Sequence, residues 1–96
     1  MDNAFMKRQE IIRELRKILS ESGISQAYLF GSFARGEKKF NDLDIAITPP
    51  EHFSLLDLSR LANRIEERTG IGADVVTLRA MHPEIRKNAA KEMVPV

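Results

Sequence analysis

One stretch of the chain, residues 31–48, constrains the possible fold more than any other. It opens with a Gly-Ser turn directly after a short apolar run at 27–30, and it continues through a basic loop into an alternating apolar run at 43–48. Alternation with a period of two places the apolar side chains on one face of a strand. Two prolines at 49–50 end this strand, because proline cannot donate to a strand ladder. The stretch therefore predicts two antiparallel strands joined by a loop that carries polar side chains.

Apolar residues at three- and four-residue spacing predict amphipathic helices around this pair of strands. Ser54 and Asp57 match a capping box at the start of the predicted helix 54–69, with Asp at the third helical position. In the predicted strand 27–30, Tyr28 is expected to lie in the core. The core stripe of the same helix is predicted to be Leu55, Leu58, Ala62 and Ile65. The predicted elements are helix 4–22, strand 27–30, strand 43–48, helix 54–69, strand 73–78, helix 83–91 and a short edge strand or free end at 94–96.

This order of elements predicts a small α+β fold. The third strand follows a helical connection, so we expect a mixed sheet of three or four strands covered by helices, within a single domain spanning residues 1–96. The exposed edges of so small a sheet favour association with another protein, which would form a hetero-oligomer.

Composition excludes several classes of protein. Hydrophobic residues make up 43% and charged residues 30% of the chain, which is typical of a folded globular domain. The net charge of +1 offers no electrostatic basis for direct nucleic-acid binding, and the absence of cysteine excludes disulfides and thiolate metal sites. No signal peptide or membrane-length apolar run is visible, so a cytoplasmic location is the default expectation.

Asp42 and Asp44 are predicted to lie on the strand face opposite the apolar one. At this spacing they are about 6.6 Å apart along the strand, so their carboxylates can converge on one cation or straddle two. Their mutual repulsion is unfavourable unless a cation offsets it. Mg²⁺ prefers such oxygen ligands, and pairs of metal ions about 3.5–4 Å apart support phosphoryl transfer. The pair therefore indicates a divalent-metal site.

Asp74 supplies a third carboxylate at the start of the strand at 73–78. If that strand lies beside the strand at 43–48, the two backbones are about 4.8 Å apart, and the side chain can reach the same metal ions. It would then bind the catalytic ion and could serve as the base for an incoming hydroxyl. An aspartate at this position could also merely terminate the strand, and both interpretations stay open.

Gly31 and Ser32 are suited to contact a phosphate. Glycine allows a sharp turn and close approach of the backbone, while serine offers a hydroxyl and an N–H group. Arg35, and less directly Lys38 and Lys39, could neutralise phosphate charge. His52 and His82 have no partners at metal-ligand spacing, and the chain has no Ser-His-Asp or Cys-His set for a hydrolase.

The two motifs together resemble those of the polymerase-beta-like nucleotidyltransferase superfamily. They are Gly-Ser-Phe-Ala-Arg-Gly at 31–36 and Asn-Asp-Leu-Asp-Ile-Ala-Ile at 41–47. The resemblance is closest to the minimal nucleotidyltransferase (MNT) antitoxins, the partners of HEPN-domain toxins, and it covers nearly the whole chain. The loop between Ser32 and Asp42 is slightly shorter than this pattern leads us to expect, which affects the roles of Lys38 and Lys39 most.

The resemblance implies that Gly31 and Ser32 contact nucleotide phosphates and that Asp42, Asp44 and Asp74 bind two Mg²⁺ ions. It also implies transfer of AMP from ATP to a tyrosine hydroxyl of a cognate HEPN ribonuclease toxin. The size of the chain is consistent with this, because a folded protein acceptor would complete the walls of a site that has no second domain.

Two other functions are compatible with the same residues. The domain could bind nucleotide without turnover and neutralise a toxin by stable complex formation, although three intact carboxylates favour an enzyme. It could instead modify a small hydroxylated molecule such as an aminoglycoside, but the missing second domain disfavours this alternative.

Overall fold

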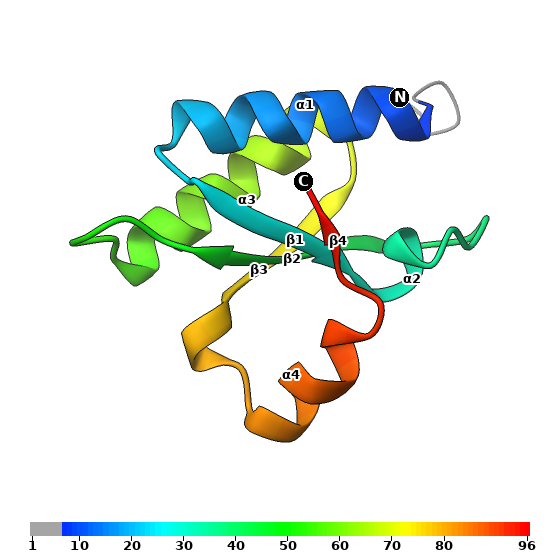
Figure 1. The fold of residues 1–96 in the computed structure, drawn as a ribbon. Coiled ribbons are helices and arrows are strands. Elements are labelled where there is room, and N and C mark those ends of the chain that lie inside the picture. The colour runs from blue at the N-terminus through cyan, green and yellow to red at the C-terminus, as the bar shows by residue number, and fades with distance from the viewer. Residues whose placement is uncertain (1–6) are drawn as a thin grey trace.

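The computed structural model describes residues 7–96, and within them one four-stranded sheet lies between helices (Figure 1). Residues 4–6 of the predicted first helix, and the N-terminal residues considered for a signal peptide, lie outside this range. The elements are α1 (Arg8–Glu21), β1 (Gln26–Phe30), α2 (Gly31–Ala34), β2 (Asp42–Thr48), α3 (Leu55–Thr69), β3 (Gly72–Thr77), the 3₁₀ helix η2 (Leu78–Ala80), α4 (Pro83–Ala90) and β4 (Val94–Pro95).

The sheet is mixed, with the strand order β3-β2-β1-β4. Strand β1 pairs antiparallel with both β2 and β4, whereas β2 and β3 are parallel and are connected through α3. This arrangement confirms the predicted α+β fold, the antiparallel pair and the helical connection. The fourth strand, at Val94–Pro95, corresponds to the first of the two alternatives predicted for 94–96, a short edge strand or a free end.

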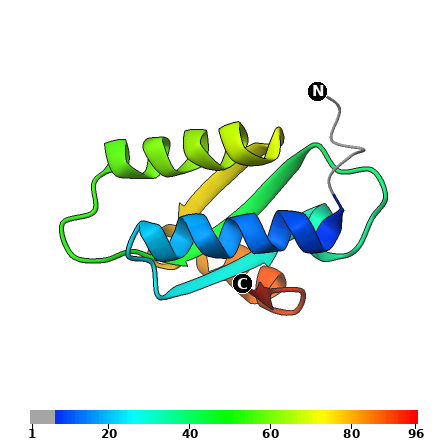
Figure 2. The ribbon, with the colours of Figure 1, turned by 90° about the horizontal axis from the view of Figure 1, so that it is seen from above.

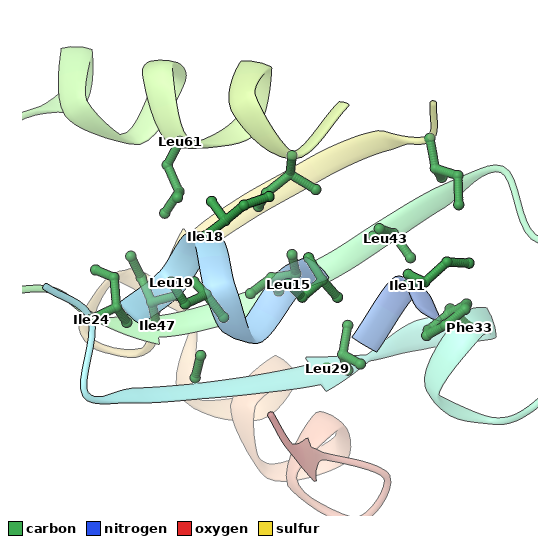
Figure 3. Close-up of a cluster of buried hydrophobic side chains, with 14 residues drawn as sticks. Ile11, Leu15, Ile18, Leu19, Ile24, Leu29, Phe33, Leu43, Ile47 and Leu61 are labelled. Carbon is green, nitrogen blue, oxygen red and sulfur yellow. The ribbon is translucent and has the colours of Figure 1, made fainter. Parts of the chain in front are cut away.

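The hydrophobic core lies between the sheet and the helices α1 and α3, which run side by side across one face (Figure 2). Leu15 and Ile18 of α1 and Leu61 of α3 belong to one buried cluster with Leu29 of β1 and Leu43 of β2 (Figure 3). These side chains are at most 3% exposed. Because every second residue of β1 and β2 faces this core, the residues between them face the other side of the sheet.

Two ion pairs connect α1 to α3 at the solvent edge of this layer. Arg64 reaches Glu21 at 2.9 Å, and Arg68 reaches Glu14 at 3.4 Å. All four side chains are partly exposed, so each pair contributes little to stability beyond fixing the relative position of the helices.

The start of α3 confirms one prediction and corrects another. The Ser54 hydroxyl accepts from the Asp57 N–H at 3.1 Å, and the Asp57 carboxylate accepts from the Ser54 N–H at 2.8 Å, so the capping box is present. Leu55 is 82% exposed, and its predicted place in the core stripe is therefore wrong. The first helical turn projects beyond the sheet, and core contact begins at Leu58.

Helix α4 lies on the face of the sheet opposite α1 and α3 (Figure 1). It begins at His82, whose Nδ1 accepts from the Glu84 N–H at 3.2 Å, and Ala89 is its buried residue. Tyr28 points to this second face and is only partly buried, so its predicted place in the core is wrong.

Across residues 7–96, no helix has the length and apolar character needed to cross a membrane.

Candidate active site

Three aspartates share the second face of the sheet, near the start of β2. Asp44 stands directly opposite Asp74 in the parallel pairing of β2 with β3, and Asp42 precedes Asp44 by two positions on the same face. The flanking residues Leu43 and Ile45 are fully buried in the core on the other face. Asp42 and Asp74 are exposed, while Asp44 is partly buried between them. The strand pairing thus brings together the carboxylates that the sequence placed on two separate strands.

The turn at Gly31 and Ser32 packs directly against Asp44. Strand β1 ends at Phe30, which is paired with Asp44, and the chain then turns into the single helical turn α2. Gly31 has a φ of +77°, and a β-carbon built on it would lie 2.2 Å from Oδ2 of Asp44. Only glycine fits both this backbone conformation and this close approach. A β-carbon on Gly72 would similarly lie 2.7 Å from Oδ1 of Asp42.

The electrostatic state of Asp44 reflects its surroundings. Burial raises the pKa of this carboxyl above its ordinary value, and the negative charges of Asp74, Asp42 and Glu92 raise it further, while Arg35 lowers it. A divalent cation would relieve this repulsion, so the chemistry of the donor set fits a metal ion. Within residues 7–96 the side chains, as they stand, form no ready group of three metal ligands.

Arg35 lies beside the turn and is held by two carboxylates. Its Nε donates to Glu37 at 2.6 Å, and its Nη1 donates to Glu92 at 3.1 and 3.2 Å. These hydrogen bonds raise the pKa of the guanidinium, with Glu37 contributing the larger effect. Lys38 and Lys39 are exposed in the loop that follows.

Glu92 is the residue that sequence reasoning missed. Its Oε1 also accepts a hydrogen bond from the backbone N–H of Gly31 at 3.3 Å, across 61 positions of the chain. Nothing in the spacing around Glu92 marks it, because it precedes a short C-terminal strand and belongs to no motif. Only the return of the chain past α4 places it beside the turn.

Aromatic contacts hold the turn in place from the core side. The buried Phe33 packs edge-on against Phe40, with ring centroids 4.9 Å apart. The guanidinium of Arg8 lies 4.3 Å from the centroid of the Phe33 ring and donates to the Phe33 carbonyl. These contacts connect α1, α2 and the loop before β2, and thereby fix the position of Gly31 and Ser32.

A cavity of about 780 Å³ lies at the other end of the sheet, away from the aspartates. It is bordered by the start of β1, the end of β2 and the segment after β3, and Tyr28, Thr48, Arg79 and Arg86 are among its lining residues. His52 also borders it. None of the predicted site residues lines this cavity, so the cavity and the aspartate cluster are separate features of the protein.

Comparison with known proteins finds similarity to nucleotidyltransferases. A family model described as a nucleotidyltransferase domain matches residues 12–96. A Methanocaldococcus jannaschii protein named "putative protein adenylyltransferase" is 40% identical over 92 residues, covering 95% of this chain and 99% of its own length.

The solved structures that share the fold include the following two. One, described as a "putative minimal nucleotidyltransferase", superposes with a TM-score of 0.82 at 29% identity and covers 96% of this chain and 98% of its own. A chain from the complex of a tri-AMPylated Shewanella oneidensis HEPN toxin with MNT antitoxin has a TM-score of 0.75 at 20% identity, over 93% of this chain and 71% of its own. At that identity the second likeness concerns the fold alone.

Proposed function

Because the chain belongs to the nucleotidyltransferase domain family, we propose that it is a Mg²⁺-dependent protein adenylyltransferase that uses ATP. The acceptor in this proposal is a tyrosine hydroxyl of a cognate HEPN-type toxin, which the modification silences. The observation that carries the proposal is the meeting of Asp44, Asp74 and the Gly31 turn on one face of the sheet.

The relatives support the choice of reaction and partner. A relative that matches nearly its whole length to this chain is named for protein adenylyl transfer. A structure with the same fold contains a HEPN toxin that carries AMP groups. The exposure of Asp42 and Asp74 is consistent with a large acceptor, because a protein partner could cover the nucleotide and exclude water.

The reaction forms a bond between the tyrosine oxygen and the α-phosphorus of ATP. The bond between that phosphorus and the oxygen bridging to the β-phosphate breaks, so diphosphate leaves and AMP stays on the acceptor. In this proposal the hydroxyl proton passes to the carboxylate of Asp74, which is exposed and lies beside Asp44.

The other residues of the site have separate roles in metal binding and phosphate contact in this proposal. Asp42, Asp44 and Asp74 would hold the metal ions, and bound Mg²⁺ would polarise the phosphoryl oxygens and stabilise the leaving group. The Gly31 N–H and the Ser32 hydroxyl would contact the nucleotide phosphates, and Arg35 would offset their charge. The raised pKa of Asp44 fits this role, because a carboxylate crowded by like charges gains most from a bound cation.

The test uses ATP labelled at the α-phosphate, Mg²⁺ and a HEPN-type protein from the same organism as the candidate partner. We expect label to enter the partner with the wild-type chain and to be lost with the double variant Asp42→Asn and Asp44→Asn. A matched control is the double variant Glu66→Gln and Glu67→Gln, which makes the same charge change on exposed positions of α3 and should retain transfer.

The same variants separate catalysis from stable binding. If the aspartate double variant still labels the partner, the assignment of the metal site is wrong. If the wild-type chain binds the partner and ATP but transfers no label, the chain acts as a non-catalytic nucleotide-binding module. Mass spectrometry of the partner identifies the modified residue and thereby tests whether it is a tyrosine.

A further inference from the structure

Glu92 places its carboxylate on two groups that the proposed function assigns to nucleotide phosphate. One carboxylate oxygen accepts from the Gly31 N–H at 3.3 Å and from Nη1 of Arg35 at 3.1 Å. The other oxygen lies 3.2 Å from the same guanidinium nitrogen. Both donors are therefore already engaged by an anion that belongs to the chain itself.

A carboxylate and a phosphate compete for such donors because both accept charge-assisted hydrogen bonds through anionic oxygens. The Glu92 side chain is 31% exposed and that of Arg35 is 46% exposed, so water reaches both partners. Exposed ion pairs are weak, and their exchange for a multiply charged phosphate group is energetically accessible. Glu92 also adds negative charge near Asp44, where an incoming triphosphate adds more.

The segment that carries Glu92 follows α4, and the Glu92 N–H donates to the Ala89 carbonyl at 3.0 Å. It leads into β4, whose two residues pair with Leu29 and Tyr28 at the edge of β1. One further backbone hydrogen bond, from the Val96 N–H to the Ala27 carbonyl at 3.0 Å, holds the C-terminal residue. A change in the position of Glu92 would therefore be transmitted directly to β4.

We infer that Glu92 is an internal competitor of the nucleotide: its carboxylate occupies the phosphate position at Gly31 and Arg35, and phosphate binding displaces it. Glu92 thus sets the affinity for nucleotide and couples phosphate binding to the packing of β4. This inference rests on the proposed function, because it takes the Gly31 turn as the phosphate site.

Calorimetric titration of the purified chain with MgATP tests the competition. Glu92→Gln keeps the size of the side chain and removes its charge, and we expect a dissociation constant about two- to fivefold lower than that of the wild type. Glu37→Gln is the matched control, because the Glu37 side chain also accepts from Arg35, whereas the Gly31 N–H donates to Glu92. Equal affinities of wild type and Glu92→Gln, or the same gain in Glu37→Gln, would overturn the inference.

Hydrogen exchange at the Val96 amide tests the coupling to β4. MgATP should accelerate this exchange in the wild type, and Glu92→Gln should show faster exchange before nucleotide is added. Unchanged exchange in both experiments would refute the coupling.

The outcomes distinguish the inference from the function on which it rests. Tighter MgATP binding by Glu92→Gln without any transfer of AMP contradicts the proposed function and leaves the competition intact. Normal transfer with equal affinities contradicts the competition alone. Failure of both proteins to bind MgATP contradicts both.

Discussion

Gly31 and Asp44 are in such close contact that a β-carbon on Gly31 would lie 2.2 Å from a carboxylate oxygen of Asp44. The turn proposed to bind phosphate and the carboxylate proposed to bind metal therefore form one unit. The pairing of Phe30 with Asp44 at the end of β1 produces this contact, since it places the next residue over the aspartate.

Replacing Gly31 by alanine should destabilise the fold more than the same change at Gly36. Both glycines have a φ near +78°, which costs an L-residue about 1–2 kcal/mol, but no atom lies within 4 Å of a β-carbon on Gly36. We expect Gly31→Ala to lower the free energy of unfolding, measured with urea, by about 1 kcal/mol or more beyond the loss in Gly36→Ala. Adding Asp44→Ala to both should shrink the difference, and an unchanged difference would contradict the contact as its cause.

Replacing Asp44 by asparagine should raise the free energy of unfolding at about pH 7 when no divalent metal is added. The folded-state pKa of Asp44 is raised by burial and by Asp74 and Asp42, so its charged form destabilises the fold. This penalty is complete above the raised pKa and disappears as the pH falls toward the ordinary value, so the gain should vanish at about pH 3. Thermal unfolding across this pH range measures the effect.

Asp57→Asn is the control of opposite sign. Hydrogen bonds from Ser54, first from its backbone N–H and then from its side chain, lower the pKa of Asp57. The charged form of Asp57 therefore stabilises the fold above the ordinary pKa, and this contribution is lost as the pH falls through the lowered value. We expect this variant to be less stable than the wild type at neutral pH, with the difference shrinking in acid. A loss of stability in Asp44→Asn at neutral pH would contradict the assigned repulsion.

Replacing Asp74 by asparagine should slow AMP transfer by about 10²- to 10⁴-fold if the carboxylate accepts the hydroxyl proton. Stability should not fall, because Asp74 is exposed and its charge repels that of Asp44. Initial rates at saturating MgATP and partner measure the effect, with Glu84→Gln on α4 as the control for loss of an exposed carboxylate. Full activity of Asp74→Asn would remove this residue from the site.

Replacing Arg8 by alanine should loosen the turn from the core side. Its stacking on Phe33 at an exposed position corresponds to about 0.5–1 kcal/mol, and the hydrogen bond to the Phe33 carbonyl is lost as well. We expect a lower urea midpoint and weaker MgATP binding, because Phe33 anchors the helical turn that begins at Gly31. Arg13→Ala removes an exposed charge from the same helix and should leave both quantities nearly unchanged. Equal effects of the two variants would contradict the role of the stacking.

Local patterns were sufficient to predict most elements of the fold. The alternation in β2 predicted which face Asp42 and Asp44 occupy, because neighbouring strand residues must point to opposite sides. The capping box at Ser54 was equally local, since it depends on residues three apart. The pattern failed at Leu55, because helical periodicity does not reveal where a helix extends beyond the sheet that it covers.

The sequence by itself predicted the type of site: a Gly-Ser turn proposed to contact phosphate, followed by paired carboxylates on one strand face. Only the tertiary structure decided that Asp74 stands directly opposite Asp44, because the register between parallel strands depends on how α3 packs the chain back onto the sheet. The contact of Glu92 with Gly31 was likewise decided by tertiary structure. Such contacts join residues far apart in the chain, and no local spacing specifies them.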